Sequence, residues 1–176
     1  GCYKAGQEPG SSICTKAEGG RCTTYKTDNG LFKNPAASPT LGSECILCWD
    51  TTGADKYTGV ENCQTCTAPN SAPGTATCNT CQDGYYKNDQ ACTKCADPCA
   101  TCETSATQCT SCSGSKYLKD SQCVEGASNG CGNGKYADPQ SNTCAECGIA
   151  DCTACKYNAT VSKPQCTACN TKKVKT

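Results

Sequence analysis

Apolar and polar positions along the chain show no sustained helical period, and no apolar run approaches the ~18 residues of a membrane-spanning helix. The pattern that does recur is short. Between two cysteines, a tyrosine stands five residues after the first, a glycine precedes it, and Asn, Asp or Lys follows at a turn, in segments 81–92, 112–123 and 131–144. This pattern predicts short β-hairpins with polar tips.

The segments that connect these hairpins are rich in Pro, Gly, Ser, Thr and Ala, as in 34–40, 68–77 and 124–130. We therefore expect a small disulfide-rich fold: an elongated array of short β-hairpins stapled by disulfides, with little helix and no large hydrophobic core. The cysteine groups divide the chain into an N-terminal cysteine-rich segment, a CxxC-repeat module and a second CxxC-repeat module, expected at residues 1–44, 45–124 and 125–176.

Composition explains why cross-links are needed. Cysteine accounts for 23 of the 176 residues, above the ~8–10% that marks a disulfide scaffold. Leu, Ile, Val and Phe together number only 12, far below the ~20% at which an ordinary core becomes feasible. Because ordering the backbone costs about 1–2 kcal/mol per residue, disulfides must offset what the core cannot. A conventional enzyme with one hydrophobic core is excluded.

Most of the cysteines follow one spacing. Eighteen of the 23 fall in nine C-x-x-C units: Cys45/Cys48, Cys63/Cys66, Cys78/Cys81, Cys92/Cys95, Cys99/Cys102, Cys109/Cys112, Cys144/Cys147, Cys152/Cys155 and Cys166/Cys169. The other five stand alone: Cys2, Cys14, Cys22, Cys123 and Cys131.

A C-x-x-C unit has three physical interpretations. Its two sulfurs can bond each other in a redox motif, which needs a βαβ setting that this sequence does not predict. Two units can bind one zinc ion, for which ~15–20 residues between units are typical. In a disulfide ladder, each cysteine instead bonds outward to a different neighbour. Gaps as short as 3 and 4 residues favour the ladder.

We expect structural disulfides, of unknown pairing, at Cys45, Cys48, Cys63, Cys66, Cys78, Cys81, Cys92, Cys95, Cys99, Cys102, Cys109, Cys112, Cys144, Cys147, Cys152, Cys155 and Cys166. Because 23 is odd, at least one cysteine lacks a partner within the chain. If the chain is a fragment, Cys2 and Cys169 are the first candidates for the free thiol.

The recurring tyrosines have a structural and a recognition interpretation. Their fixed distance from cysteines favours rings that lie on neighbouring disulfides and replace part of the missing core. Trp49, directly after Cys48, is interpreted in the same way. An exposed aromatic patch would instead indicate a binding surface.

Charge and residue types exclude further classes. Lys plus Arg and Asp plus Glu number 16 each, and no basic face indicates a nucleic-acid partner. Histidine is absent, which removes the commonest general base and every Cys–His pair. Carboxylates do not cluster, so we expect no enzyme and no catalytic residues. The cysteine density favours an oxidising, extracellular compartment.

One modification motif is present. Asn158, Ala159 and Thr160 form an N-glycosylation sequon. We expect Asn158 to lie in an exposed loop at 156–165, where a glycan is possible.

Two resemblances follow from these residues. The spacing within residues 78–123, followed by Gly and Tyr, resembles furin-like cysteine-rich repeats. A closer match is to the variant-specific surface proteins of Giardia, which are built of C-x-x-C units with Gly, Thr, Ser and Ala spacers. The opening GCYKAGQEPGSSIC (1–14) is similar to part of that family's ectodomain, and NGLFKNPAASPTLGSECILC (29–48) resembles its recurring stretch.

The family resemblance implies a cell-surface coat antigen, expressed one variant at a time, that presents changing epitopes to host antibodies. It also implies a C-terminal membrane anchor that this sequence lacks, and therefore a piece of an ectodomain. Contact with host-cell surfaces is possible. Zinc binding has been proposed for the family; here we expect no cofactor and keep zinc as an alternative.

Two other functions stay open from the residues alone. One is an adhesion or receptor-like binding module, which an exposed aromatic patch would support. The other is a zinc-binding CxxC protein, which free thiols and bound metal would support.

Overall fold

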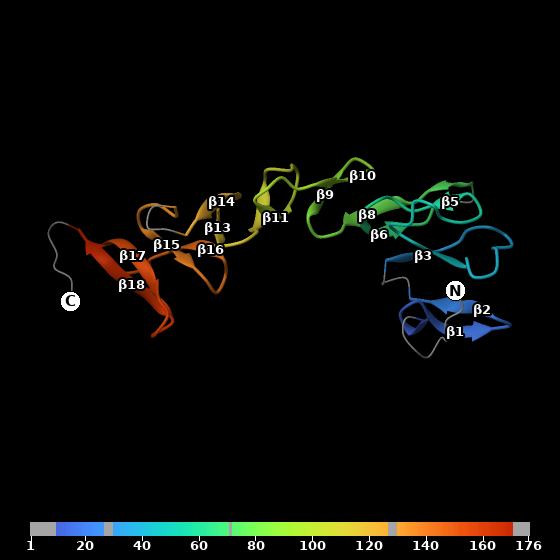
Figure 1. The fold of residues 1–176 in the computed structure, drawn as a ribbon, viewed down its shortest axis with the longest axis horizontal. Helices are drawn as coiled ribbons and strands as arrows, with labels where there is room; N and C mark the ends of the chain where they lie inside the picture. Colours follow the sequence, from blue (N-terminus) through green and yellow to red (C-terminus); the bar gives the residue numbers. More distant parts are fainter. Residues whose placement is uncertain (1–9, 27–29, 71, 127–129, 171–176) are drawn as a thin grey trace. The chain divides into compact units, whose positions relative to one another are not determined.

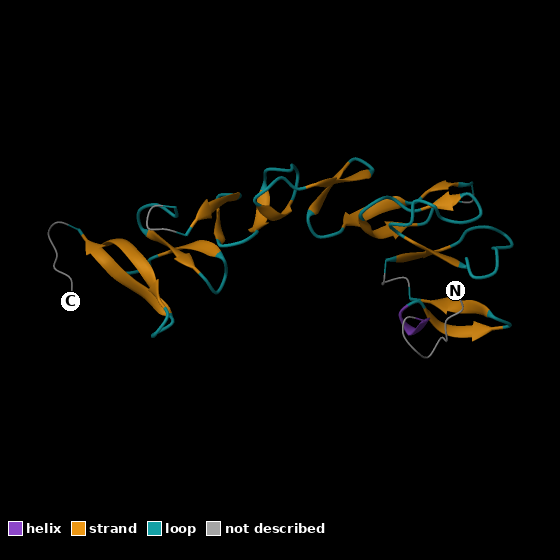
Figure 2. Ribbon diagram, in the orientation of Figure 1, coloured by secondary structure: helices purple, strands orange, loops and turns teal. Residues whose placement is uncertain are grey.

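The computed structural model describes residues 10–26, 30–70, 72–126 and 130–170 (Figure 1). Figure 2 shows that these residues form strands and loops, with one short 3-10 helix, η1 (Gly10–Ser12). Within the described residues, no helix has the length and apolar character needed to cross a bilayer. The expected disulfide-rich fold of small β-hairpins with little helix is therefore confirmed.

The chain divides into two compact units, Gly1–Thr93 and Lys94–Thr176. The segment boundaries expected after residues 44 and 124 stay predictions. The strands of the first unit are β1 (Cys14–Glu18), β2 (Arg21–Tyr25), β3 (Leu31–Lys33), β4 (Cys45–Leu47), β5 (Tyr57–Thr58), β6 (Cys63–Thr67), β7 (Gly74–Thr75), β8 (Thr77–Cys81), β9 (Tyr85–Asn88) and β10 (Ala91–Lys94), the last of which ends one residue past the boundary.

Each sheet of the first unit has two strands. The pairs β1–β2, β3–β4 and β6–β8 are antiparallel, the pair β5–β7 is parallel, and β9 pairs with β10. Their common core is small and consists largely of sulfur and aromatic rings: Phe32, Ile46, Cys48, Tyr57, Cys63, Ala76 and Cys78. Sulfur thus occupies positions that aliphatic side chains fill in ordinary domains.

The second unit contains β11 (Cys99–Cys102), β12 (Cys109–Cys112), β13 (Lys116–Lys119), β14 (Gln122–Glu125), β15 (Lys135–Asp138), β16 (Thr143–Glu146), β17 (Cys152–Asn158) and β18 (Lys163–Cys169). Strands β11–β12 and β17–β18 form separate antiparallel pairs. The hairpins β13–β14 and β15–β16 join through a single parallel bridge between β13 and β16, which gives a four-stranded sheet in the order β14-β13-β16-β15.

All three hairpins predicted from the glycine–tyrosine pattern form; we call them the tyrosine hairpins. The strand pairs β9–β10, β13–β14 and β15–β16 lie at segments 81–92, 112–123 and 131–144, and the second strand of each ends two residues after the segment's last cysteine. Their tips are exposed and include left-handed residues at Asp89, Asp120 and Asn142. Asp and Asn tolerate this conformation better than most residues, so the polar tip residues are those that the turns require.

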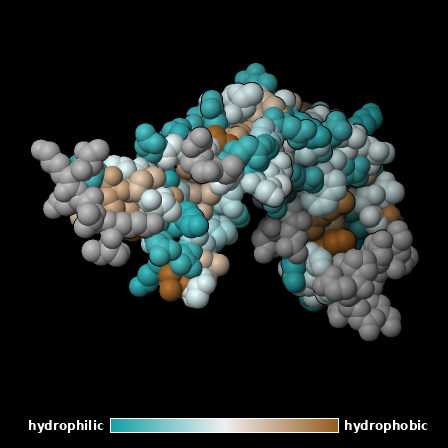
Figure 3. Space-filling model, turned by 60° about the vertical axis from the view of Figure 1, so that its left-hand side comes forward, coloured by the Kyte–Doolittle hydropathy of each residue, from teal (hydrophilic) through white to brown (hydrophobic). Residues whose placement is uncertain are grey.

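The surface is largely polar. Figure 3 shows one face, on which hydrophilic and intermediate residues predominate and strongly hydrophobic ones are confined to small areas. Large apolar side chains that are exposed among the described residues are Leu41, Trp49, Ile149 and Val161.

Candidate functional site

Ten disulfides connect the described cysteines: Cys14–Cys22, Cys48–Cys66, Cys63–Cys78, Cys81–Cys92, Cys95–Cys102, Cys99–Cys109, Cys112–Cys123, Cys131–Cys144, Cys147–Cys155 and Cys152–Cys166. No C-x-x-C unit is closed on itself. Each bonded cysteine of a unit joins a neighbouring unit or a neighbouring hairpin, as in a ladder. This pairing leaves no redox C-x-x-C bond among the units.

One bonding rule repeats three times. In β6–β8, β11–β12 and β17–β18, two C-x-x-C units lie antiparallel, and the first cysteines of the two units bond across the strands. The second cysteine of the leading unit bonds to an upstream cysteine. The second cysteine of the trailing unit bonds 11 residues ahead in the first two cases, at the far end of a tyrosine hairpin.

Cys169 occupies this trailing position in β18 and is not bonded. Its Sγ lies 4.0 Å from Sγ of Cys166, which is bonded to Cys152. Cys2, the other candidate for an unpaired thiol, lies outside the described residues.

Cys45 differs from the expectation that it is bonded: it is a free, half-buried thiol. The strand register gives the reason. Cys45 faces Lys33, one residue after Phe32, just as Cys144 faces Ala137, one residue after Tyr136. The β3–β4 pair therefore corresponds to the tyrosine hairpins, with Phe32 in place of the tyrosine.

In the tyrosine hairpins, the bonded cysteine stands five residues before the tyrosine. Five residues before Phe32 the sequence has Thr27. The partner that the repeat would supply to Cys45 is thus replaced by threonine. This signal is present in the sequence, but only the register identifies Phe32 as the equivalent position.

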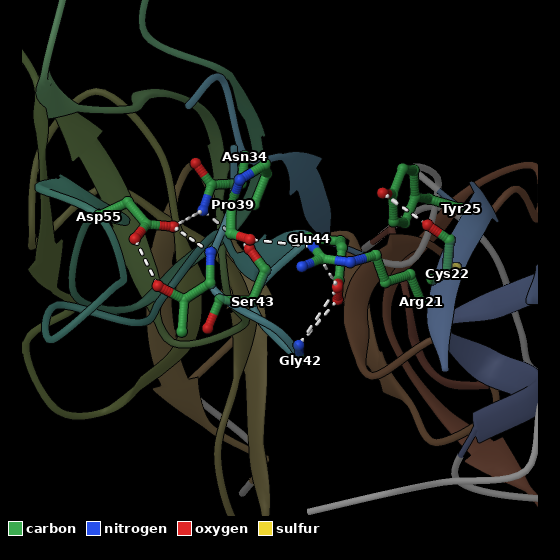
Figure 4. Close-up of polar contacts among 10 residues, drawn as sticks. Arg21, Cys22, Tyr25, Asn34, Pro39, Gly42, Ser43, Glu44 and Asp55 are labelled. Atoms are coloured by element: carbon green, nitrogen blue, oxygen red, sulfur yellow. Dashed lines mark hydrogen bonds and ion pairs between the residues drawn. The ribbon is translucent and has the colours of Figure 1, made fainter. Parts of the chain in front are cut away.

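A polar clamp holds the loop between β3 and β4 (Figure 4). Asn34, only 1% exposed, donates from Nδ2 to Ser43 O and to Asp55 Oδ2, both at 2.8 Å, and accepts from the Ala36 amide. Asp55 also accepts from the amide and the hydroxyl of Thr40, at 3.0 and 2.7 Å. These hydrogen bonds lower the pKa of Asp55, with those from Thr40 the main cause.

The other end of the loop is held by Glu44. Its carboxylate accepts from the Gly42 amide at 3.1 Å and pairs with Arg21 Nη1 at 3.3 Å. Arg21 also donates to Pro39 O at 3.0 Å, so β2 is tied to the loop (Figure 4). Burial, and then the Glu44 carboxylate, raise the pKa of the adjacent Cys45 thiol. That thiol is therefore a weak nucleophile at neutral pH.

The clamped loop is well suited to recognition. Hydrogen bonds hold Thr40 and Gly42, the two neighbours of Leu41, whereas the Leu41 side chain is 63% exposed. A loop that is ordered before binding loses little entropy when a partner contacts it. Sequence reasoning treated 34–40 as a connecting segment and missed the clamp, because Asn34 and Asp55 lie 21 residues apart.

The second unit contains an open pocket of about 660 Å³ walled by aromatic rings. Tyr136 on β15 and Tyr157 on β17 stack with ring centroids 6.3 Å apart, and Tyr117 lines the same pocket. Its two charged lining residues are Lys135 and Lys156. Lys135 is paired with Glu146 at 3.2 Å, outside the lining.

The aromatic side chains singled out in the sequence differ in their exposure and contacts. Tyr57 is 4% exposed and belongs to the core cluster, in agreement with the structural interpretation. Trp49 is 40% exposed, although its ring approaches Gly30 so closely that a Cβ there would lie 2.8 Å from it. Tyr136 contacts another tyrosine.

Asn158, the sequon residue, is the last residue of β17 and is half-buried. Its Nδ2 donates to Gln165 on β18 at 3.0 Å, and its Oδ1 accepts from the Thr160 amide. The exposed hairpin loop covers 159–162, a shorter stretch than the predicted 156–165. Glycosylation of Asn158 stays a prediction.

A cluster of sulfurs lies between β8 and β10. The Sγ atoms of Cys78, Cys81 and Cys92 lie within 4.8 Å of one another, which is close enough for a shared metal ion. All three are disulfide-bonded in this structure, whereas zinc binds thiolates. Metal binding here would require reduction first.

Comparison with known proteins gives the chain's relatives. No protein-family profile and no solved structure matches it. It is 48% identical to variant-specific surface protein VSP4A1 of Giardia intestinalis over 99% of this chain and 26% of the relative. It is 30% identical to the major surface-labeled trophozoite antigen 417 of the same organism, over 96% of this chain and 22% of the relative.

A weaker match covers fewer residues. The chain is 37% identical to proprotein convertase subtilisin/kexin type 5 of Branchiostoma californiense, over 45% of this chain and 5% of the relative. This match supports the resemblance to furin-like cysteine-rich repeats. Over nearly its whole length, the chain therefore resembles the variant-specific surface proteins of Giardia and spans about a quarter of the relative VSP4A1.

Proposed function

We propose that the chain is part of a non-enzymatic, cysteine-rich antigen of the cell surface that coats the cell and takes part in antigenic variation and immune evasion. The observation that carries the proposal is the division between framework and loops. Bridges with sequence separations of only 7 to 18 residues hold the strands, while loops such as 159–162, between the bridged strands β17 and β18, are exposed. The two Giardia relatives, each named as a surface protein, support the location.

A ladder of short bridges suits this function physically. Each bridge contributes about 2–4 kcal/mol, mainly by restricting the unfolded chain. The strands themselves contribute few core contacts, so the bridges hold the fold. Loop residues can therefore change with little effect on folding, except those that belong to the clamp or to the turns. Host antibodies would then be the partners, and exposed loop side chains such as Leu41 would be the contacts.

Staining of live cells tests the proposal. Antibodies raised against the oxidised chain are applied to cells that express the protein, before and after permeabilisation. We expect staining before permeabilisation, in only a fraction of a clonal population. Staining that requires permeabilisation would contradict the surface location, and uniform, stable staining of every cell would contradict antigenic variation.

An adhesion module is a second candidate, favoured by the tyrosine-walled pocket of the second unit. Aromatic walls and a few polar groups are usual in ligand sites. The substitution Tyr157→Ala tests it. Reduced attachment of the isolated chain to host cells would support adhesion, and unchanged attachment would contradict it.

A further inference from the structure

Two disulfides of the first unit are in direct contact. Sγ of Cys78, bonded to Cys63, lies 3.6 Å from Sγ of Cys92, which is bonded to Cys81. Neither sulfur carries a proton, so the contact is a van der Waals one. Within the described part of the chain, Cys78, Cys81 and Cys92 are the only three cysteines whose Sγ atoms all lie within 4.8 Å of one another.

The two bridges differ in access. Cys63 and Cys78 are each 0% exposed and belong to the core cluster, whereas Cys81 and Cys92 are only partly buried against it. An external thiol can therefore reach the outer bridge, while the inner bridge is closed to it. Once its own bond is broken, Cys92 is placed to attack the inner bridge, because its Sγ lies 3.6 Å from that of Cys78.

We propose that these four cysteines form a thiol–disulfide exchange site, in which a small dithiol that reduces the outer Cys81–Cys92 bridge causes the buried Cys63–Cys78 bridge to rearrange. A thiolate of the reductant attacks Sγ of Cys81, forms a mixed disulfide with it and releases Cys92 as a thiolate. Exchange then proceeds because a thiolate lies in contact with a disulfide sulfur.

The exchange step conserves sulfur oxidation states. Sγ of Cys92 attacks Sγ of Cys78; the Cys78–Cys92 bond forms, the Cys63–Cys78 bond breaks, and the electron pair leaves with Cys63, which takes a proton from water. The second thiol of the reductant then closes its own disulfide and releases Cys81 as a thiol. One dithiol is oxidised, and the protein gains thiols at Cys63 and Cys81.

The rearrangement changes the core of the first unit. The β6–β8 pair loses its cross-strand bridge, and β8 becomes bonded to β10 through Cys78 in place of Cys81. A reducing event at the surface is thus converted into a change within the small core. The bridge Cys112–Cys123 serves as the internal control, because it has the same separation of 11 residues but lies outside any three-sulfur group.

Limited reduction tests the site. The full chain is treated with dithiothreitol until about one bridge per molecule is lost, quenched with acid to stop exchange, and then alkylated in acidic denaturant and mapped. We expect label at Cys63 and Cys81 from the first site, but at Cys112 and Cys123 from the control bridge. Label at Cys81 and Cys92, or loss of the outer bridge only together with general unfolding, would overturn the proposal.

Two variants give a test without reductant. Cys81→Ser leaves Cys92 as a thiol beside Cys78, and we expect the label to move from Cys92 to Cys63. Cys112→Ser leaves Cys123 as a thiol, and there the label should stay on Cys123. A label that stays on Cys92 in correctly folded Cys81→Ser, judged by retention of the other nine parental bridges in the same map, would overturn the proposal.

Discussion

Asn34 and Asp55 are joined by a hydrogen bond of 2.8 Å from Asn34 Nδ2 to Asp55 Oδ2. The first residue follows β3 and the second precedes β5, so the bond fixes the loop that begins at Asn34 to a separate part of the first unit (Figure 4). In a chain with few aliphatic side chains, such polar contacts stabilise the fold where an ordinary domain would use a hydrophobic core.

Replacing Asn34 by alanine should therefore loosen this loop. The substitution leaves Ser43 O without its side-chain donor and removes the acceptor of the Ala36 amide, which we expect to cost about 1–3 kcal/mol. The measurement is the rate of chymotrypsin cleavage after Leu41, which should rise. Asn79→Ala is the control, because Asn79 is exposed and its bonds to Thr67 lie at the surface. Equal cleavage rates in the two variants would contradict the clamp.

The clamp should also depend on pH. The pKa of Asp55 is lowered in the folded chain, so its contribution is present above the ordinary carboxyl value of ~3.9 and is lost as pH falls through the folded pKa. The difference in stability between the parent chain and Asp55→Asn should accordingly be largest near neutral pH and shrink in acid. Asp83→Asn, at an exposed position, provides the comparison. A difference that does not change with pH would show that Asp55 acts without its charge.

The sequence predicts local structure here better than long-range contacts. The hairpins around Tyr86, Tyr117 and Tyr136 could be predicted, because the glycine, the tyrosine and the turn residues act within about ten positions of each other. The Asn34–Asp55 contact could not, since nothing in the spacing of two polar residues distinguishes a buried pair from two solvated ones.

The disulfide pairing shows the same limit. Outward bonding of each C-x-x-C unit follows from the short gaps between units. Which cysteines bond depends on register: Cys63 faces Cys81 across β6–β8 but is bonded to Cys78. Such a diagonal bond needs the strand geometry, which no spacing supplies.

Counting thiols separates the ladder from a zinc protein. The 23 cysteines less the 20 in the ten bridges leave three: Cys2, Cys45 and Cys169. Alkylation in denaturant without reductant should therefore add no more than three labels, as read by intact mass. Elemental analysis of the same sample gives the metal content. Many labels together with several bound zinc ions would replace the ladder by thiolate sites.

Resistance to proteases should depend on the bridges. With reductant absent, trypsin reaches little extended chain, because neighbouring bridges limit local opening. Full reduction should shorten the half-life by about tenfold or more, since even one bridge contributes about 2–4 kcal/mol. The control is the chain reduced and then reoxidised, which should recover its lifetime. Equal lifetimes with and without reductant would mean that the strands are stable without the bridges.

The equivalence of Phe32 to the hairpin tyrosines makes the sharpest prediction about the framework. If β3–β4 is a tyrosine hairpin that has lost one cysteine, Thr27→Cys should restore the missing bridge by bonding to Cys45. Alkylation in denaturant without reductant should then label neither Cys45 nor the new thiol at position 27, whereas Cys45 takes the label in the parent chain. Thr52→Cys is the matched control, because it adds a cysteine at an exposed position outside this hairpin and should leave Cys45 reactive. If both the new thiol and Cys45 are alkylated in the Thr27→Cys variant, the β3–β4 pair shares only its strand register with the tyrosine hairpins, and the unpaired state of Cys45 has another cause.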